Sequence, residues 1–391
     1  MNIEERIQRR RRPDHEPRLV RKSDALTPTA HPADPTGRAL VIERLLDVLD
    51  PVFDGQPPAD CYVWGPKGAG KSAVIRALFV HLDRLIGRAP DRIYTTTRAE
   101  PTADIAFVYV DGRAAKTGFA LLHAVLSSLS NDSVPKKGVG TDALRAQLRD
   151  RLAPDSRYAV VAVDHVEEPK TLSVQAVYEQ FDAFGSSVTP VLSGRSPPDE
   201  IEADCLTEAR TVRFGSYRQH MLVETLAVRQ TDGLSSSAVT HEQLRQLAAW
   251  ANGDAHDALA ALFSAGLIAD ENGHERITPA DLSAGMDAVP HSCVSLGRVL
   301  ALPESRQQVL CRLLALSDAD RRSVGTAADA IADERVDLSR ATIERVLYEL
   351  AEVGVVRRLK VDDPSQTGRP PSRLEPRFPT LVFSHLAAAC P

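Results

Sequence analysis

The 391-residue sequence is poor in lysine, aromatic residues and cysteine, and these shortages narrow the class of protein. Its five cysteines stand singly along the chain and never form a Cys-x-x-Cys pair. This spacing argues against a disulfide framework and against a zinc site, and it fits a reducing cytoplasm. No apolar stretch is long enough to cross a bilayer, and no signal-peptide pattern opens the chain. We therefore expect a cytoplasmic protein that does not enter the membrane.

The remaining composition is that of a globular protein, with 43% hydrophobic and 26% charged residues. A chain of this length can bury two or three separate cores. Only 8 of its 47 basic residues are lysines, a skew that indicates a GC-rich genome or a salty cytoplasm. The net charge of −6 neither favours nor excludes nucleic acid, because binding depends on where the positive charge lies.

Residues 1–36 combine an arginine run at positions 9–12 with five prolines and no apolar periodicity. Such a segment cannot bury a core, so we expect a flexible basic arm. The arm is either a solvated tail or an element that touches the DNA backbone.

Residues 37–214 alternate between predicted helices and short apolar strands. The expected strands are 61–64, 105–110, 158–163 and 188–193, and the expected helices are 39–49, 72–86, 117–130 and 141–152. Strands that are apolar throughout and alternate with helices predict a parallel sheet covered on both faces, an α/β domain. Pro190 predicts that the last of these strands lies at an edge or forms a bulge.

The C-terminal half has a different pattern. Residues 215–290 predict helices only. Residues 291–391 predict helices near 303–316, 324–333 and 339–353, followed by strand-like segments at 355–360 and 380–383. Three helices followed by a two-stranded hairpin are typical of a winged-helix module.

The clearest motif is a phosphate-binding loop between a predicted strand and a predicted helix. It consists of Gly65, Pro66, Lys67, Gly68, Ala69, Gly70, Lys71 and Ser72. Glycines let backbone N–H groups surround phosphates at the start of a helix. Lys71 then reaches the terminal phosphates and the Ser72 hydroxyl ligates Mg²⁺. The loop predicts binding of a nucleoside triphosphate.

A loop of this kind needs an acidic partner to hold the metal, and Asp164 follows a buried strand at the expected place. Many such enzymes have glutamate at the next position as the general base, but this chain has His165. Imidazole can accept a proton with a different reach. Glu167 and Glu168 are alternatives further along the turn, and the pattern favours nucleotide binding with slow or absent hydrolysis.

The predicted third helix of the winged-helix module begins near Ser339, and its first turns carry Ser339, Arg340, Thr342 and Arg345. In such modules this helix enters the major groove and the wing touches the backbone. Arg369 and Arg373 lie where the wing is expected. We expect these residues to contact double-stranded DNA, although winged helices also dock proteins.

Several motifs in order along the chain resemble the AAA+ initiators of the origin recognition complex and their archaeal relatives. They are Arg38 with the helix after it, the runs 107–112 and 116–119, the run 138–144, and the run 253–259. The resemblance extends from about Pro35 to the C-terminus. It implies an AAA+ ATPase base, an all-α lid and a winged helix at 37–214, 215–290 and 291–391. It also implies ATP or ADP with Mg²⁺, with Arg38 beside the adenine and His256 at the lid's sensor position.

The chain departs from the family pattern at three positions. His165 replaces an acid, Gly194 stands near the usual asparagine, and His256 replaces the sensor arginine. Neutral imidazole lacks the bidentate fork of arginine. The family's trans-acting arginine finger is matched by no clear residue, with Arg210 and Arg213 as candidates. Together these departures imply weakened or lost hydrolysis.

The resemblance implies an initiator that binds duplex DNA, with self-association on DNA and replication proteins such as a helicase as partners. Two alternatives stay open. One is a nucleotide-sensing regulator that binds DNA. The other is an accessory AAA+ protein of a plasmid or mobile element.

Overall fold

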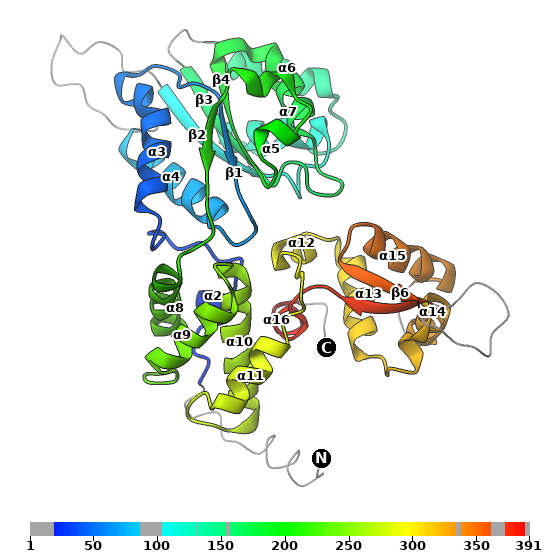
Figure 1. Ribbon diagram of the computed structural model, residues 1–391. Helices are drawn as coiled ribbons and strands as arrows, with labels where there is room; N and C mark the ends of the chain where they lie inside the picture. The colour runs from blue at the N-terminus through cyan, green and yellow to red at the C-terminus, as the bar shows by residue number, and fades with distance from the viewer. Residues whose placement is uncertain are drawn as a thin grey trace. The chain divides into compact units, whose positions relative to one another are not determined.

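A computed structural model describes residues 19–86, 104–130, 132–153, 157–333, 338–360 and 372–387 (Figure 1). The chain forms two compact units. One contains residues 31–217, and the other contains the described residues up to Ala30 together with those from Arg218 onward. The chain therefore passes from one unit to the other twice. No helix within the described ranges is long and apolar enough to cross a membrane.

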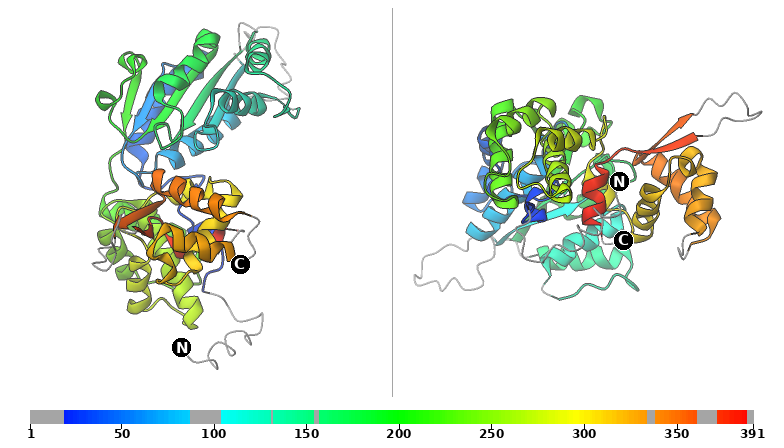
Figure 2. Two further views of the ribbon diagram at one scale, coloured as in Figure 1. Left: turned by 90° about the vertical axis from the view of Figure 1, so that its right-hand side faces the viewer. Right: turned by 90° about the horizontal axis from the view of Figure 1, so that it is seen from below.

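The unit of residues 31–217 is built on a five-stranded parallel sheet with the strand order β2-β3-β4-β1-β5. Its strands are β1 (Cys61–Trp64), β2 (Asp104–Asp111), β3 (Arg157–Asp164), β4 (Val188–Gly194) and β5 (Arg210–Arg213). Helices cover both faces, as Figure 2 shows. They are α3 (Ala39–Leu49), α4 (Lys71–Leu85), α5 (Gly118–Leu129), α6 (Thr141–Leu152) and α7 (Val174–Phe181).

Strand β3 shows why both faces need cover, since every residue from Tyr158 to Asp164 is buried. Ala159, Val161 and Val163 pack in one apolar core, against helices α5, α6 and α7. The alternate residues Tyr158, Val160 and Ala162 pack in a second core, against α3 and α4. Period-two alternation divides one apolar run between two cores. The predicted doubly covered α/β sheet is confirmed.

Strand β4 lies between β3 and β1, so the prediction that Pro190 marks an edge or bulge is wrong. Pro190 is paired with Val161 inside the ladder, and all seven residues of β4 are buried. In a parallel ladder a residue bonds to only one of its two neighbouring strands. A proline there removes one backbone N–H donor from the ladder with one neighbouring strand. The remaining ladder hydrogen bonds keep β4 in the sheet.

The second unit contains four lid helices, which agrees with the helix-only prediction. They are α8 (Gln219–Gly233), α9 (His241–Trp250), α10 (Ala255–Asn272) and α11 (Pro279–Asp287). Helix α10 is central, because most of its residues are buried on all sides. Reciprocal capping bonds between Thr240 and Gln243 begin α9, and the same arrangement of Thr278 and Asp281 begins α11.

The segment from Leu19 to Ala30 packs against the lid helices, which corrects the expectation of a flexible arm for this part of the chain. It includes the short helix α2 (Ser23–Leu26). The side chains of Leu19 and Leu26 are buried. Leu26 packs so closely against α8 that a Cβ added to Gly233 would lie 2.4 Å from the Leu26 Cγ. The arginine run at 9–12 lies outside the described residues.

Arg229 of α8 fixes this segment to the lid. Arg229 as a whole is 6% exposed. It donates to the carbonyl oxygen of Thr27 at 2.6 Å and to that of Ala30 at 3.1 Å. Buried donors need such partners, since an unsatisfied one costs about 1–3 kcal/mol. Residues 19–30 are therefore part of the lid's hydrogen-bonded structure.

The module that follows the lid has the predicted winged-helix order. Its elements are α12 (Leu296–Leu300), α13 (Glu304–Ala315), α14 (Val324–Asp333), α15 (Arg340–Glu352), β6 (Val356–Lys360), β7 (Ser372–Pro376) and α16 (Thr380–Leu386). Strands β6 and β7 form the antiparallel hairpin.

The second strand of this hairpin was placed wrongly in the sequence prediction, which put it at 380–383. Those residues begin α16, which starts directly after Pro379. Phe383 packs edge-on against Phe378 at 5.2 Å between ring centroids, and His385 packs in the same way against Phe263 of α10. Apolar residues that suggested a strand instead belong to the buried face of a short helix.

Candidate functional site

The loop between β1 and α4 has the backbone conformation that its glycines permit. Gly65, Gly68 and Gly70 have φ values of +150°, +70° and +81°. A Cβ on Gly65 would lie 2.1 Å from the carbonyl oxygen of Phe214. Other residues are strained at such angles. The loop therefore requires these glycines, as the motif predicted.

Lys71 is the first residue of α4, and it is 9% exposed. Its Nζ donates to the carbonyl oxygens of Gly65 at 2.7 Å and Pro66 at 3.0 Å. The start of a helix already carries partial positive charge. An ammonium held at the start of a helix therefore adds its charge to an end of the helix that already favours an anion.

Arg38 and Tyr217 lie beside the loop. The Arg38 guanidinium stacks on the Tyr217 ring, 3.5 Å from its centroid. A Cβ on Gly70 would lie 2.8 Å from the Tyr217 hydroxyl. Arg38 is 6% exposed, and within the described chain its Nε and Nη2 have no hydrogen-bond partner. Buried unsatisfied donors next to a phosphate loop fit a ligand rich in acceptors, such as a nucleotide.

Asp164, the last residue of β3, is fully buried and charged. Its carboxylate accepts from the Tyr109 hydroxyl at 2.7 Å and from its neighbour's backbone N–H at 2.8 Å. Burial raises its pKa, but the His165 imidazole and the Ser72 and Tyr109 hydroxyls outweigh this, so the pKa lies well below its ordinary value. A carboxylate and a hydroxyl are oxygen ligands of the kind Mg²⁺ prefers, so Asp164 and Ser72 fit the predicted metal site.

His165 occupies the position where the family pattern has an acidic residue. Its Nε2 lies 3.4 Å from Asp164 Oδ2, and its Nδ1 lies 3.9 Å from Glu168 Oε1. Burial lowers its pKa below the ordinary value, although Asp164 opposes the shift. The backbone is left-handed here and at Glu167, with φ of +62° and +64°. Glu167 is exposed.

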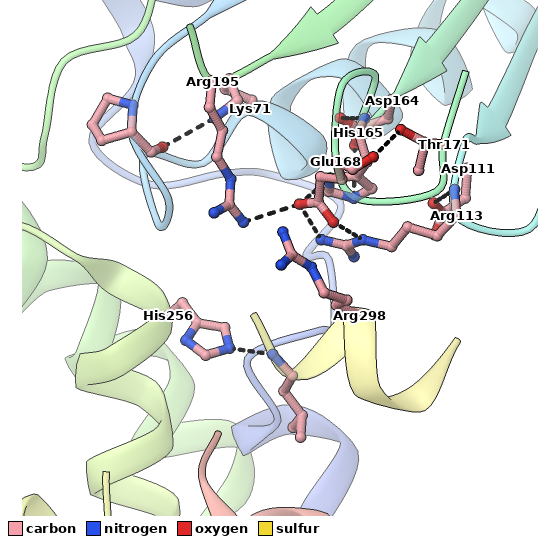
Figure 3. Close-up of polar contacts among 12 residues, drawn as sticks. Lys71, Asp111, Arg113, Asp164, His165, Glu168, Thr171, Arg195, His256 and Arg298 are labelled. Atoms are coloured by element: carbon pink, nitrogen blue, oxygen red, sulfur yellow. Dashed lines mark hydrogen bonds and ion pairs between the residues drawn. The ribbon is translucent and has the colours of Figure 1, made fainter. Parts of the chain in front are cut away.

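Glu168 is buried and held by two arginines (Figure 3). Arg113 donates through Nε to Oε2 at 2.9 Å and through Nη2 to Oε1 at 3.0 Å. Arg195 donates through Nη2 to Oε1 at 2.9 Å. We call these three residues the Glu168 cluster. Arg113 gave no signal in the sequence, because 55 residues separate it from its partner.

The position expected for the family's asparagine is Gly194, the end of β4. A Cβ there would lie 2.3 Å from the hydroxyl of Tyr62. That hydroxyl donates to the carbonyl oxygen of Ser196 at 2.8 Å. The Tyr62 side chain therefore fills the space, and Arg195 is the next residue with a polar side chain.

His256 begins the central lid helix, and both of its ring nitrogens are bonded within the lid unit. Nε2 accepts the backbone N–H of Leu296 at 2.8 Å, and Nδ1 lies 2.8 Å from Asp257 Oδ1. Since Nε2 accepts, Nδ1 carries the proton. Cys293 lies nearby in a metal-like cluster with both residues, but this tautomer leaves His256 without a lone pair for a metal. Contact between His256 and nucleotide stays a prediction.

The exposed face of α15 carries part of the predicted DNA-binding set. Ser339 caps the helix by accepting the backbone N–H of Thr342. Arg345 is exposed, and Tyr348 is 42% exposed. The Arg358 guanidinium of β6 lies 4.9 Å above the Tyr348 ring. This face therefore joins the helix to the hairpin through cationic and aromatic side chains.

The other predicted DNA-binding arginines are paired with acids. Arg340 forms an ion pair with Asp329, and Arg373 forms one with Asp318 at 3.2 Å. Arg369 lies outside the described residues. Exposed pairs of this kind contribute about 0–1 kcal/mol, so they do not prevent either arginine from exchanging its partner for a phosphate.

Comparisons with known proteins agree with this geometry. Residues 34–192 match the AAA ATPase domain, and residues 223–286 match the Cdc6 AAA+ ATPase-type lid domain. ORC1-type DNA replication protein 6 of Halobacterium salinarum is 24% identical over 330 residues, which cover 81% of this chain and 82% of that protein.

Two solved structures have the same fold. The ORC1 protein of Aeropyrum pernix, determined in complex with DNA, has a TM-score of 0.64 and 21% identity, covering 95% of this chain and 97% of that one. Cdc6p of Pyrobaculum aerophilum has a TM-score of 0.55 and 18% identity, with the same coverage of both chains.

The five-stranded parallel sheet, the phosphate loop and the helical lid define an AAA+ ATPase. Within this class, the chain belongs to the Orc1/Cdc6-type family of replication initiators, as a distant relative of its archaeal members.

Proposed function

We propose that this initiator binds ATP or ADP with Mg²⁺, hydrolyses ATP slowly, and binds double-stranded DNA through its winged helix. The nucleotide part rests above all on Arg38, a buried guanidinium with two unsatisfied nitrogens beside the glycine loop. Lys71, Ser72 and Asp164 complete a set of groups suited to phosphates and a divalent cation.

Each group has a distinct role in this proposal. The loop's backbone N–H groups and Lys71 hold the phosphates, while Ser72 and Asp164 hold the metal. Arg38 and Tyr217 bind the part of the nucleotide next to the loop. Bound ATP supplies a phosphoanhydride whose cleavage needs a positioned water. The residues that would position this water are the ones in which the chain departs from its family.

We expect turnover below about 0.1 s⁻¹, under the ~1–10³ s⁻¹ of typical enzymes. His165 contacts Asp164, Glu168 is held by two arginines, and Gly194 offers no side chain. Phosphate release from the purified protein, with and without DNA, measures this rate. His165→Glu should raise it about tenfold or more by restoring a carboxylate base, whereas His165→Asn should not. Brisk hydrolysis that depends on Lys71 would contradict the proposal.

For DNA, the exposed face of α15 and β6 supports contact with the backbone. Replacing both Arg345 and Arg358 with alanine should weaken duplex binding about tenfold or more. It should also reduce the slope of log K against log salt by roughly 1–2, because two phosphate contacts are lost. Fluorescence anisotropy at several salt concentrations measures both quantities. Arg245→Ala, which removes an exposed lid arginine, is the matched control.

Loss of affinity without a change in salt slope would contradict a phosphate-binding role for this face. No effect at all would favour the alternative that the winged helix docks a protein. Mapping of bound DNA in cells then separates the functions, because focal peaks at replication origins support an initiator and promoter peaks support a regulator.

A further inference from the structure

Arg38 is a buried cation beside the glycine loop, and its Nε and Nη2 have no acceptor among the residues that the structure describes. These atoms form the side-on fork of a guanidinium, in which the N–H donors lie in one plane and point the same way. Arg113 uses the same atoms to bind both carboxylate oxygens of Glu168. The fork of Arg38 can therefore bind a pair of neighbouring acceptors that a ligand supplies.

The fold holds this fork in place beside the loop. Arg38 is the N-cap of α3, where its carbonyl oxygen accepts backbone N–H groups of the first helical turn. Tyr217 follows Phe214, whose carbonyl oxygen would lie 2.1 Å from a Cβ on Gly65. The Tyr217 ring supports the guanidinium, whose Cζ is 3.5 Å from the ring centroid. A guanidinium stacked on a ring directs its N–H groups sideways, so the fork faces the edge of a ligand.

The purine edge that carries N7 differs between guanine and adenine. Guanine presents N7 and O6 there, which are both acceptors, and arginine binds this pair with both donors of its fork. Adenine presents N7 next to its N6 amino group, which is itself a donor. Against adenine, one of the buried N–H groups of the fork stays without an acceptor, which is unfavourable. Arg38 therefore matches guanine better than adenine.

We propose that Arg38 recognises the base of the bound nucleotide, and that the site accepts guanine nucleotides at least as well as adenine nucleotides. This inference rests on the proposed nucleotide binding, and it adds GTP and GDP to the ligands. The loop and Lys71 bind the phosphates in that proposal, so the fork of Arg38 is available to the base. Tyr217 is a positioning residue, because it holds the guanidinium in place.

The first test compares GDP with ADP, each with Mg²⁺, by isothermal titration calorimetry. The phosphates of the two ligands are identical, so the ratio of their affinities reports on the base alone. Wild-type protein should bind GDP at least as tightly as ADP. Arg38→Gln replaces the fork with one acceptor and one donor, the pair that matches adenine, and should shift this ratio about tenfold toward ADP. Arg44→Gln, which removes an exposed arginine of α3, should leave the ratio unchanged.

Arg38→Lys separates the fork from the charge. Lysine keeps a positive charge but lacks the planar pair of donors. This variant should bind GDP about tenfold more weakly, while its ADP affinity changes by less than about twofold. If Arg38 instead binds the sugar or a phosphate, each substitution will change both affinities by the same factor.

Substitutions of Tyr217 test its positioning role. Tyr217→Leu removes the ring beneath the guanidinium, so it should lower the affinity for GDP relative to ADP. Tyr217→Phe keeps the ring and should preserve the ratio. A melting curve of each variant without nucleotide checks that it folds. If Arg38→Gln does not fold, the Arg38→Lys and Tyr217 variants still decide the matter.

The outcomes are distinct. If wild-type protein binds neither GDP nor ADP, the proposed function fails. If it binds ADP more tightly than GDP, or if the Arg38 variants keep the wild-type ratio, recognition of guanine by Arg38 is overturned while nucleotide binding stands.

Discussion

Protein without residues 1–30 is expected to melt about 6 °C or more below the full-length chain, or to lose its lid altogether. Within the described part of this segment, the deletion removes the buried apolar side chains of Leu19, Val20 and Leu26. Truncating even one buried leucine to alanine costs about 2–5 kcal/mol. The deletion also leaves Arg229 buried without its two carbonyl partners. The entropy that the segment no longer loses on folding offsets part of this.

We expect a net loss of at least about 3 kcal/mol, which corresponds to that shift in melting temperature for a unit of this size. Deletion of residues 1–18 alone is the matched control, because it leaves every described contact of residues 19–30 in place. Leu26→Ala should reproduce part of the loss without any truncation. Thermal or urea unfolding measures all three proteins. Equal stability of the two deletions would show that residues 19–30 contribute nothing to the lid.

Lys71→Ala is expected to abolish nucleotide binding, with an affinity loss of about 100-fold or more. The substitution removes the buried ammonium group that lies at the start of α4 and bonds to the loop. Hydrogen bonds from a charged donor are worth about 1.5–3 kcal/mol each, and this ammonium can donate more than one to phosphate oxygens. The glycine backbone stays intact, so weak residual binding through N–H groups is the most that should remain.

Calorimetric titration with ATP and ADP measures this loss, and a melting curve without nucleotide checks that the variant folds. Lys136→Ala is the matched control, because Lys136 is exposed and lies outside the loop. Unchanged nucleotide affinity in Lys71→Ala would show that nucleotide does not bind at this loop, and it would contradict the proposed function.

The elements that the sequence predicted well have apolar residues at regular spacing or an unmistakable motif. Strand β3 is apolar throughout, and α15 has buried residues at Ile343, Val346, Leu347 and Leu350, as its spacing indicated. Strand β5 was missed because only Val212 of its four residues is buried. Its pairing with β1 comes from the tertiary fold and leaves little trace in composition.

The candidate site shows the same division. The glycine loop and Asp164 were predicted because their chemistry requires fixed spacing along the chain. Arg113 and Tyr217 were not, because each meets its partner from a distant part of the sequence. A paired arginine and an unpaired one look alike in sequence. Only the structure shows that Glu168, one of three candidate bases, is the one held by two guanidinium groups.

The double passage of the chain between its units has a consequence for how the protein is made. Residues 19–30 are synthesised long before the lid helices, yet the backbone N–H of Leu19 donates to the Asp270 carboxylate, 251 residues later in the chain. Domains generally fold as they are synthesised, from the N-terminal side. The sheet of residues 31–217 can therefore form before residues 19–30 pack, because these residues need the lid helices as partners. Contacts over such sequence distances form slowly, so packing of residues 19–30 against the lid helices should be a late step in folding.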